Sequence, residues 1–326
     1  MARFALAVDI GGTKILSALV RDDGTVVARS RVDTPGRGVE PVLGAVVATV
    51  EDVMREDAAT RDQVVAVGVG APGPMNPETG IVYDPPNMEG WHDVPLGTML
   101  SERLGMRVFI ENDANAAAVG EWWVGAGQGV SDLIYITVST GIGGGIIIGD
   151  RLHHGVSGTA GEVGHMTIDL HGPPCPCGRS TGCLEVLASG TAIARMAREA
   201  VESGRRSAVL EMAGGRPEAI TAAMVEAAAR EGDEVAGEVF TRAATYLGVG
   251  MANLLNLFNP ERIVIGGGVS NAGEMLFAPV RRIARARAFE RPGRDAQIVP
   301  ASLGDDVGAV GAAAVAFQRA GMRLRS

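Results

Sequence analysis

The sequence predicts an α/β protein with two domains. The chain has 326 residues, which is longer than a single ordinary hydrophobic core requires. Short apolar segments typical of strands alternate along it with segments of helical periodicity. A strand, a glycine-rich turn and a returning strand also occur twice, at residues 4–20 and 132–149, about 130 residues apart. This repeat indicates two related halves that meet near residue 120, although no low-complexity linker separates them.

The composition is that of a globular protein and excludes several functional classes. Apolar residues make up 46% and charged residues 21% of the chain, while glycine is abundant and aromatic residues are scarce. The net charge of −9 argues against a general nucleic-acid binder, but not against a bound nucleotide. The N-terminus has no apolar signal region, and no later run is long enough to cross a membrane. We therefore expect a soluble, cytoplasmic protein without a membrane partner.

Apolar periodicity and turn residues predict the order of the elements. The first half is expected to contain strands at 4–10, 15–20, 25–32, 64–70 and 107–111, with helices at 39–56, about 95–103 and up to Trp123. The second half is expected to contain strands at 132–139, 146–149 and 296–300, with helices at about 185–203, 217–230, 233–256 and 308–320. Between the helix predicted at 233–256 and the strand predicted at 296–300, residues 261–275 predict a strand, a Gly-Gly-Gly turn and a helix that starts at Ser270 or Asn271.

The first glycine turn follows a buried strand that ends in Asp9. Gly11, Gly12, Thr13 and Lys14 form its tip, where the glycines allow the backbone to approach a phosphate. The Asp9 carboxylate could face a magnesium ion, directly or through water. An ordinary tight turn would use the same residues. The motif is not a P-loop, and the GxGxxG pattern of a Rossmann domain is missing.

Two further stretches of the first half carry polar side chains beside predicted elements. Asp113 lies where a strand gives way to an alanine-rich helix, within Glu111-Asn-Asp-Ala-Asn115. It could cap the helix, or act as a general base from that junction. Asn87 lies in a Pro/Gly/Asn-rich loop, where it could hydrogen-bond a polar ligand or simply form a turn.

Two more glycine turns belong to the second half. Thr140, Gly141 and Gly143 repeat the pattern of the first glycine turn. Gly267 and Gly268 lie between a strand and a helix, where they could support an adenine or ribose, or form a plain β–α turn. The two matched strand–turn–strand units together indicate a phosphate-facing hairpin in each half.

The stretch 161–185 contains all three cysteines of the chain. Cys175, Cys177 and Cys183 follow His165, and Glu162 and Glu185 flank them. One nitrogen and three sulfur ligands at this spacing suit a closed, tetrahedral structural zinc site. A chance cluster or a disulfide is the alternative, although no secretory context supports a disulfide.

Taken together, these motifs resemble those of the ROK sugar kinases (repressor, open reading frame, kinase). The resemblance depends on Asp9–Lys14, Glu111–Ala118, Ser139–Gly145 and Glu162–Glu185, which occur here in the family's order. It covers the whole chain and is greatest to the bacterial ATP-dependent glucokinases. It implies the two-domain actin/hexokinase/Hsp70-like (ribonuclease H-like) fold, with ATP and sugar in an interdomain cleft.

The resemblance also implies domain boundaries and an assembly state. Residues 1–118 would form a small N-terminal α/β domain, and residues 119–307 a large α/β domain that carries the zinc-binding loop. The C-terminal helix at about 308–322 would pack back onto the first domain. The partners would be the hexose and ATP, with no nucleic acid, in a homodimer or homotetramer.

The roles implied by the resemblance fall into four groups. Asp113 would be the catalytic base. The sugar would bind to Asn87, Asn112, Asp113, Glu162, His165 and Glu185. ATP with Mg²⁺ would bind to Asp9, Gly11, Gly12, Thr13, Lys14, Thr140, Gly141, Gly143, Gly267 and Gly268. A structural Zn²⁺ would bind to His165, Cys175, Cys177 and Cys183, and His165 would also face the sugar.

The loop between the last two cysteines departs from the family's pattern. Gly178–Gly182 is one residue longer than usual, which can shift Glu185 and with it the shape of the sugar pocket. The implied reaction is phosphorylation of glucose to glucose 6-phosphate, in carbohydrate metabolism and glycolysis. The alternatives are a kinase for N-acetylmannosamine, N-acetylglucosamine or fructose, and a sugar-sensing repressor. The repressor would need a DNA-binding helix-turn-helix, whereas the first predicted strand begins at about residue 4.

Overall fold

The computed structural model describes residues 2–36, 38–56, 62–85 and 88–324. The chain folds into two compact units. Unit 1 comprises Met1–Tyr135, Gly145–Gly161 and Ala301–Ser326, and unit 2 comprises Ile136–Gly144 and Glu162–Pro300. The predicted boundary after residue 118 is not one of these breaks, and the division into two domains at that point stays a prediction.

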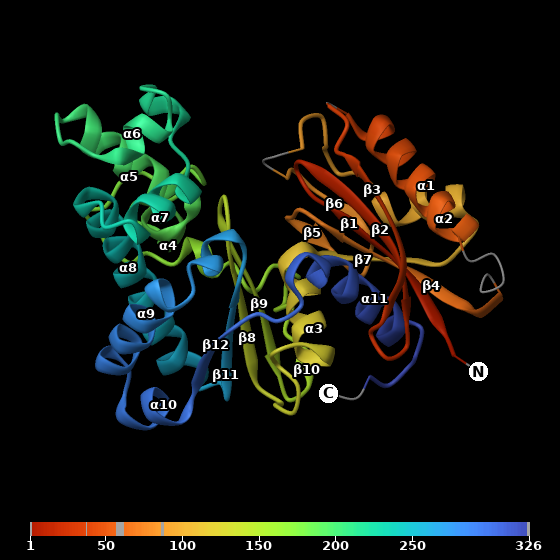
Figure 1. The fold of residues 1–326 in the computed structure, drawn as a ribbon. Coiled ribbons are helices and arrows are strands. Elements are labelled where there is room, and N and C mark those ends of the chain that lie inside the picture. The colour runs from red at the N-terminus through yellow and green to blue at the C-terminus, as the bar shows by residue number, and fades with distance from the viewer. Residues whose placement is uncertain (1, 37, 57–61, 86–87, 325–326) are drawn as a thin grey trace. The chain divides into compact units, whose positions relative to one another are not determined.

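Unit 1 contains a five-stranded sheet of order β3-β2-β1-β4-β7 (Figure 1). Its strands are β1 (Phe4–Ile10), β2 (Lys14–Arg21), β3 (Val26–Asp33), β4 (Val64–Ala71) and β7 (Val108–Asn112). Strands β1, β2 and β3 form an antiparallel meander, whereas β4 and β7 run parallel to β1. The carboxyl ends of β1, β4 and β7 therefore lie at one edge of the sheet. The short hairpin of β5 (Met75–Asn76) and β6 (Ile81–Val82) follows β4.

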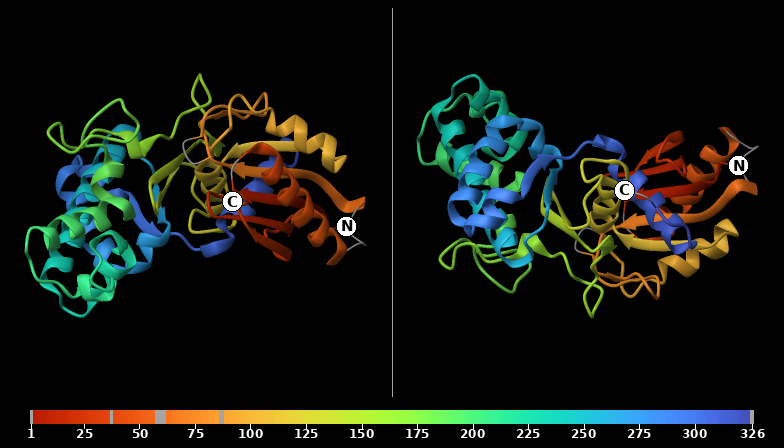
Figure 2. Two further views of the ribbon diagram at one scale, coloured as in Figure 1. Left: turned by 90° about the horizontal axis from the view of Figure 1, so that it is seen from above. Right: turned by 90° about the horizontal axis from the view of Figure 1, so that it is seen from below.

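The two faces of this sheet carry side chains of different size. Leu6 and Val8 belong to a core that also contains residues of α1 (Val39–Glu56) and α2 (Leu96–Leu104). On the other face, Gly68 allows α11 (Val307–Arg319) to approach closely, because a Cβ there would lie 1.8 Å from the Ala312 carbonyl oxygen. Figure 1 and the right-hand view of Figure 2 show α11, in blue, against these strands. Small residues on this face thus seat the helix.

Helix α11 also packs against α3 (Asp113–Val124) through small residues. A Cβ at Gly311 would lie 2.0 Å from the Ala116 carbonyl oxygen, so the two backbones nearly touch. At the far end Trp123 and Phe317 meet edge to face, with 5.8 Å between ring centroids. The sequence-based expectation that the last helix packs closely on another helix is confirmed.

The buried carboxylate of Glu121 joins α3 to the segment that leads into α11. Glu121 is fully buried, and it accepts hydrogen bonds from the amides of Ala126 (2.7 Å), Ser302 (3.0 Å) and Leu303 (2.9 Å). The Ser302 hydroxyl donates to it as well, at 3.3 Å. One side chain therefore satisfies three backbone donors from two separate loops.

Replacing Glu121 is expected to destabilise the protein strongly. In Glu121→Ala the partly buried amides of Ala126 and Leu303 lose their acceptor, whereas the exposed Ser302 can turn to water. Each unsatisfied donor that stays out of water costs about 1–3 kcal/mol. We expect the free energy of unfolding, measured by urea titration, to fall by about 3 kcal/mol or more. The matched control is Glu51→Ala at an exposed position of α1, where the change is expected to stay within about 0.5 kcal/mol. Equal losses of stability in the two variants would contradict the structural role assigned to the Glu121 carboxylate.

A second five-stranded sheet has the order β10-β9-β8-β11-β12. Its strands are β8 (Leu133–Val138), β9 (Ile142–Ile148), β10 (Arg151–Leu152), β11 (Arg262–Gly266) and β12 (Gln297–Pro300). The helices of unit 2 are α4 (Leu184–Ala188), α5 (Gly190–Glu202), α6 (Ala208–Met212), α7 (Ala222–Arg230), α8 (Glu234–Phe258), α9 (Glu274–Arg287) and α10 (Glu290–Asp295). Short 3₁₀ turns occur at Val163–His165, Pro217–Ala219, Gly268–Ala272 and Gly304–Asp306.

The structure corrects three expectations about helices in unit 2. The helix predicted at 185–203 is two helices, because Ser189 leaves the helical conformation and caps α5 by accepting a hydrogen bond from the Ala192 amide at 3.1 Å. The segment predicted as a helix from residue 217 starts as a 3₁₀ turn, and α7 begins at Ala222. Helix α9 begins after Gly273 rather than at Ser270 or Asn271. Among the described helices, none combines the length and apolar character needed to span a bilayer.

Candidate active site

The junction between β7 and α3 presents Asp113. Asn112 is the N-cap of α3, and its side-chain oxygen accepts hydrogen bonds from the amides of Ala114 (3.0 Å) and Asn115 (3.2 Å). Asp113 is the first residue of the helix, and its side chain is exposed. The N-cap is therefore Asn112 and not Asp113, although Asp113 Oδ1 also accepts a hydrogen bond from the Ala114 amide at 2.8 Å. The Asp113 side chain nevertheless lies on the exposed side of this edge of the sheet.

Asp9 and Asp113 flank the end of the same strand. A Cβ at Gly70 of β4 would lie 3.7 Å from the Asp113 Cα and 3.8 Å from Asp9 Oδ1. Burial raises the pKa of Asp9, and the nearby Lys14 ammonium opposes that effect. Gly308 leaves room for this carboxylate, since a Cβ there would lie 2.4 Å from Asp9 Oδ2. Unit 1 therefore places the candidate base and the candidate magnesium ligand at one edge of its sheet.

Hydrogen bonds from Thr34, the residue after β3, stabilise the first glycine turn. The Gly11 amide donates to the Lys14 carbonyl at 2.9 Å, which closes the turn. The Thr34 hydroxyl donates to the Gly11 carbonyl at 2.6 Å, and its amide donates to the Thr13 carbonyl at 3.0 Å. Gly12 and Thr13 are exposed at the tip, where their backbone is accessible to a ligand.

The predicted zinc ligands come together in unit 2. One ligand atom from each of His165, Cys175, Cys177 and Cys183 lies within 4.8 Å of the others, and the three cysteines are free thiols. Ligand atoms of a tetrahedral zinc site lie about 3.5–4 Å apart, so this donor set fits the ion with a small contraction. The longer loop from Gly178 to Gly182 does not prevent the four residues from converging.

The thiols of this cluster differ in environment. Burial raises the pKa of Cys175 to about 12. Hydrogen bonding from the Arg179 backbone, and then from the Cys175 side chain, lowers the pKa of Cys177. The buried thiol of Cys175 thus favours its protonated form, whereas the thiolate of Cys177 is stabilised. A cation bound among the sulfur atoms would favour the thiolate form of all three cysteines.

The two ring nitrogens of His165 face different groups. Nδ1 lies 3.6 Å from Cys175 Sγ, on the side of the cysteines. Nε2 lies 3.9 Å from the Glu162 carboxylate, at the other edge of the ring. This geometry is what the predicted dual role of His165 requires, with one nitrogen for the metal and one for the substrate side.

Glu185 connects the cysteine cluster to the second glycine turn. It follows Cys183 by two residues in α4, and its Oε2 accepts a hydrogen bond from the Ile142 amide at 2.9 Å. A Cβ at Gly141 would lie 2.4 Å from the same oxygen. The sequence had placed Glu185 with the sugar and Gly141 with ATP, and the structure brings them into direct contact.

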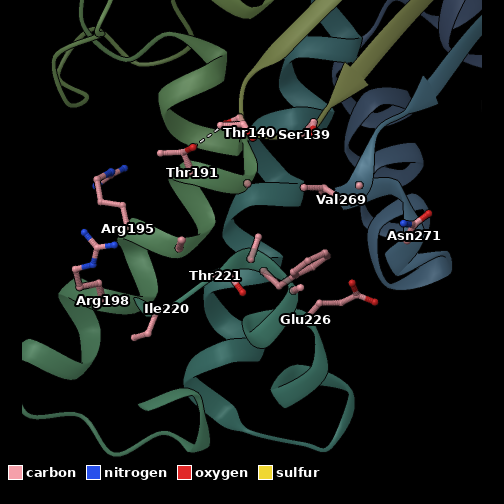
Figure 3. Close-up of a pocket in the computed structure, with 16 residues that line it drawn as sticks. Ser139, Thr140, Thr191, Arg195, Arg198, Ile220, Thr221, Glu226, Val269 and Asn271 are labelled. Carbon is pink, nitrogen blue, oxygen red and sulfur yellow. Dashed lines mark hydrogen bonds between the residues drawn. The ribbon is translucent and has the colours of Figure 1, made fainter. Parts of the chain in front are cut away.

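A cavity of about 710 Å³ lies in unit 2 next to the second glycine turn (Figure 3). Two of the predicted ATP-binding residues line it, Thr140 and Gly268. Gly267 has a structural role beside it, because its φ is +85° and a Cβ would lie 2.4 Å from the Val138 carbonyl oxygen. Further lining residues that the sequence analysis missed include Thr191, Arg195, Arg198, Ile220, Thr221, Glu226 and Asn271.

Local hydrogen bonds hold the walls of this cavity. The Thr191 hydroxyl donates to the Thr140 carbonyl at 2.8 Å, which attaches α5 to the glycine turn. Arg195 and Arg198 extend from α5 on one side, opposite Glu226 and Asn271 (Figure 3). Arg198 donates to the Pro217 carbonyl at 3.2 Å and so fixes the loop before α7. These residues come from distant segments of the chain, and no short sequence motif joins them.

The predicted site residues are distributed over both units. Unit 1 carries Asp9, Gly11, Gly12, Thr13, Lys14, Asn112 and Asp113. Unit 2 carries Thr140, Gly141, Gly143, Glu162, His165, Cys175, Cys177, Cys183, Glu185, Gly267 and Gly268. Asn87 lies outside the described residues.

The comparisons with known proteins identify the class and then the family. The chain has the fold of a ROK glucokinase from Streptomyces griseus, solved with glucose and AMPPNP, with a TM-score of 0.84 and 39% identity over 97% of this chain and 99% of that one. It also matches a ROK hexokinase from Thermus thermophilus, with a TM-score of 0.81 and 35% identity over 98% and 99% of the two chains. Residues 5–319 match the ROK family model, and the chain belongs to the ROK family.

The sequence comparison agrees with the structural one. A glucokinase from Halalkalibacterium halodurans is 40% identical over 311 residues, which cover 95% of this chain and 93% of that protein. The predicted fold class, α/β with the actin/hexokinase/Hsp70-like (ribonuclease H-like) architecture, is confirmed by these neighbours. The resemblance to ROK sugar kinases that the motifs indicated is confirmed as well.

Proposed function

We propose that this protein transfers the γ-phosphoryl group of ATP to a hexose, with D-glucose as the substrate and glucose 6-phosphate as the product. The observation that carries the proposal is the exposed Asp113 at the end of β7, beside Asp9 at the end of β1. The similarity of this chain to glucokinases along nearly its whole length supports glucose as the phosphoryl acceptor.

The proposed mechanism assigns the proton transfer to Asp113. Its carboxylate accepts the proton of the sugar 6-hydroxyl while that oxygen forms a bond to the γ-phosphorus. The bond between the γ-phosphorus and the bridging oxygen breaks, and ADP leaves with that oxygen. Phosphoryl transfer needs little covalent help, so positioning of the hydroxyl and the phosphate provides most of the acceleration. A general base contributes a further ~10²–10⁴-fold.

The remaining polar residues would position the two substrates. Asn87, Asn112, Glu162, His165 and Glu185 would bind sugar hydroxyls, since a hydroxyl left without a partner costs roughly 1–3 kcal/mol. Asp9 would hold Mg²⁺, which neutralises charge on the phosphates when it is bound. The backbone at 11–14 and 140–143 would bind the phosphates.

We also propose that the His165/cysteine cluster holds a structural Zn²⁺. His165 Nδ1 and the three Sγ atoms fit the ion as a closed set of four ligands, with no position left for a substrate. The ion would fix the loop from which Glu162 and Glu185 project, and would take no part in the phosphoryl transfer.

The adenosine of ATP would occupy the 710 Å³ cavity in unit 2. Ala223 lines it on α7 and is exposed. Ala223→Trp is expected to raise the KM for ATP about tenfold or more by filling the space, because a few lost contacts cost over 1.4 kcal/mol. The KM for glucose should change little. Ala223→Ser is the control, and steady-state kinetics with each substrate varied in turn would measure both effects; an unchanged KM for ATP would place the adenosine elsewhere.

A panel of sugars tests the function directly. Purified protein with ATP and Mg²⁺ would be offered glucose, mannose, fructose, N-acetylglucosamine and N-acetylmannosamine, with ADP release as the readout. The proposal expects the highest kcat/KM with glucose. A higher value for an N-acetylated sugar or fructose would assign a different kinase activity. Binding of a sugar without ADP release for any of them would favour a sensor.

A further inference from the structure

The buried carboxylate of Glu111 lies directly before the proposed catalytic turn. Glu111 is the fourth residue of β7 and is 4% exposed. Its Oε1 accepts hydrogen bonds from the Asn112 amide and from Asn115 Nδ2, both at 3.0 Å. The same side chain thus holds the backbone at the start of the turn and the first turn of α3. Asp113 lies between these two anchor points.

His154 provides the third partner of Glu111. Its Nε2 lies 2.7 Å from Glu111 Oε2, while the other carboxylate oxygen is occupied by the two bonds described above. His154 is fixed in the loop after β10, because its carbonyl accepts a hydrogen bond from the Ala160 amide at 2.9 Å. Three donors therefore surround one buried carboxylate, and only His154 can supply a full positive charge.

Further charged groups of unit 1 lie near His154. The hydrogen bond to Glu111 raises the pKa of His154, burial opposes this, and the charges of Glu111 and Glu78 raise it further. Arg319 of α11 lowers it and is itself paired with Glu78. Arg319 also lies over the Phe109 ring, 5.6 Å from its centroid, on the same strand as Glu111. These groups bias His154 towards the imidazolium form.

We infer that Glu111 and His154 are positioning residues, whose ion pair holds the Asn112–Asp113 turn in its reactive arrangement and makes kcat depend on the proton of His154. The inference rests on the proposed role of Asp113 as the base. When His154 is charged, Glu111 has an opposite charge beside it and the turn is held tightly. When the proton leaves, a neutral N–H can still donate, but charge-assisted bonds are about twice as strong as neutral ones.

The sign of the pH dependence follows from the direction of the pKa shift. The pKa of His154 is raised, so the charged pair is complete below the ordinary histidine value of about 6.5. It is lost as the pH rises through the raised value. We therefore expect an alkaline limb in the kcat profile, with a decline of about 3- to 10-fold between two plateaus.

Two substitutions of His154 imitate its charged and its neutral form. His154→Arg keeps a permanent positive charge, and kcat is expected to stay near the high plateau with the limb abolished. His154→Gln keeps a neutral donor, and kcat is expected to stay near the low plateau at every pH. His153→Gln at the exposed neighbouring position is the matched control and should retain the wild-type profile. Glu78→Gln should move the limb to lower pH, because that charge raises the pKa of His154.

A histidine titration by NMR reports on the pair independently of catalysis. In wild-type protein the His154 signal should titrate above the ordinary value, at the same pH as the kcat limb. In Glu111→Gln it should titrate at lower pH, and circular dichroism would verify that this variant folds. The inference is overturned if His154 titrates while kcat stays flat, or if His154→Arg keeps the wild-type limb. Absence of turnover with every sugar of the panel would instead overturn the proposed function, and the catalytic role of the pair with it.

Discussion

Replacing Asp113 by asparagine is expected to lower kcat for glucose by about 10²–10⁴-fold, the contribution of a general base. The substitution Asp113→Asn preserves the size of the side chain, and Asn112 remains the cap of α3. The helix should therefore keep its start, and the affinity for glucose should stay within a few-fold of wild type. Rapid-quench measurements of product in a single turnover would separate the chemical step from product release.

The outcome of this experiment is informative in both directions. Asp62→Asn, at an exposed position before β4, serves as the control and should leave kcat unchanged. Full activity in Asp113→Asn would exclude the base assignment. A loss of glucose affinity equal to the loss of kcat would indicate a binding role instead.

Removal of one zinc ligand is expected to weaken sugar binding through the loop that the metal holds. In Cys177→Ser most of the bound zinc should be lost, because a neutral hydroxyl replaces a thiolate ligand. The affinity for glucose should then fall by about 10- to 100-fold, as Glu162, His165 and Glu185 lose their common anchor. Elemental analysis gives the zinc content, and isothermal titration calorimetry gives the dissociation constant.

The contact between Glu185 and the Ile142 amide predicts a second effect of the same variant. Loosening α4 should also disturb the second glycine turn, so the KM for ATP should rise, although less than that for glucose. Arg179→Ala in the same loop leaves all four ligands in place and serves as the control. One equivalent of zinc retained in Cys177→Ser would show that the cluster is misassigned.

The sequence predicted the longer strands and the convergence of His165 with the three cysteines, because both have a local signal. It placed the returning strand of the second unit at 146–149, whereas β9 begins at Ile142 and includes Gly143. Buried strands such as β1 and β4 are short apolar runs bounded by turns, and the ligands are rare residue types at a recognisable spacing. The helix boundaries were predicted less well. Periodicity alone cannot show that Ser189 caps a new helix, or that a Cβ at Gly190 would lie 2.8 Å from the Ser139 carbonyl oxygen.

The residues that the sequence analysis missed share a different property. His154 and Glu121 act through partners that are distant in the chain, such as Ser302 for Glu121. Glu111 belongs to a motif that the sequence showed, but its pairing with His154 did not appear there. A single buried carboxylate has no periodic pattern, and its partners become visible only when the fold is known. The cavity residues on α5 and α7 were missed for the same reason, because no short motif joins Arg198 to Asn271.

The packing of α11 on the first sheet has a consequence for biosynthesis. The strands that end next to Asp9 and Asp113 are complete by residue 113, but the face that receives Ala312 at Gly68 is covered only after residues 307–319 have been made. At ~5–20 residues per second, roughly 10–40 s of translation separate the two events. During this time the nascent chain exposes an apolar surface, so we expect chaperones to bind it on the ribosome. The edge of unit 1 that carries Asp9 and Asp113 would then mature only after residues 307–319 have been made.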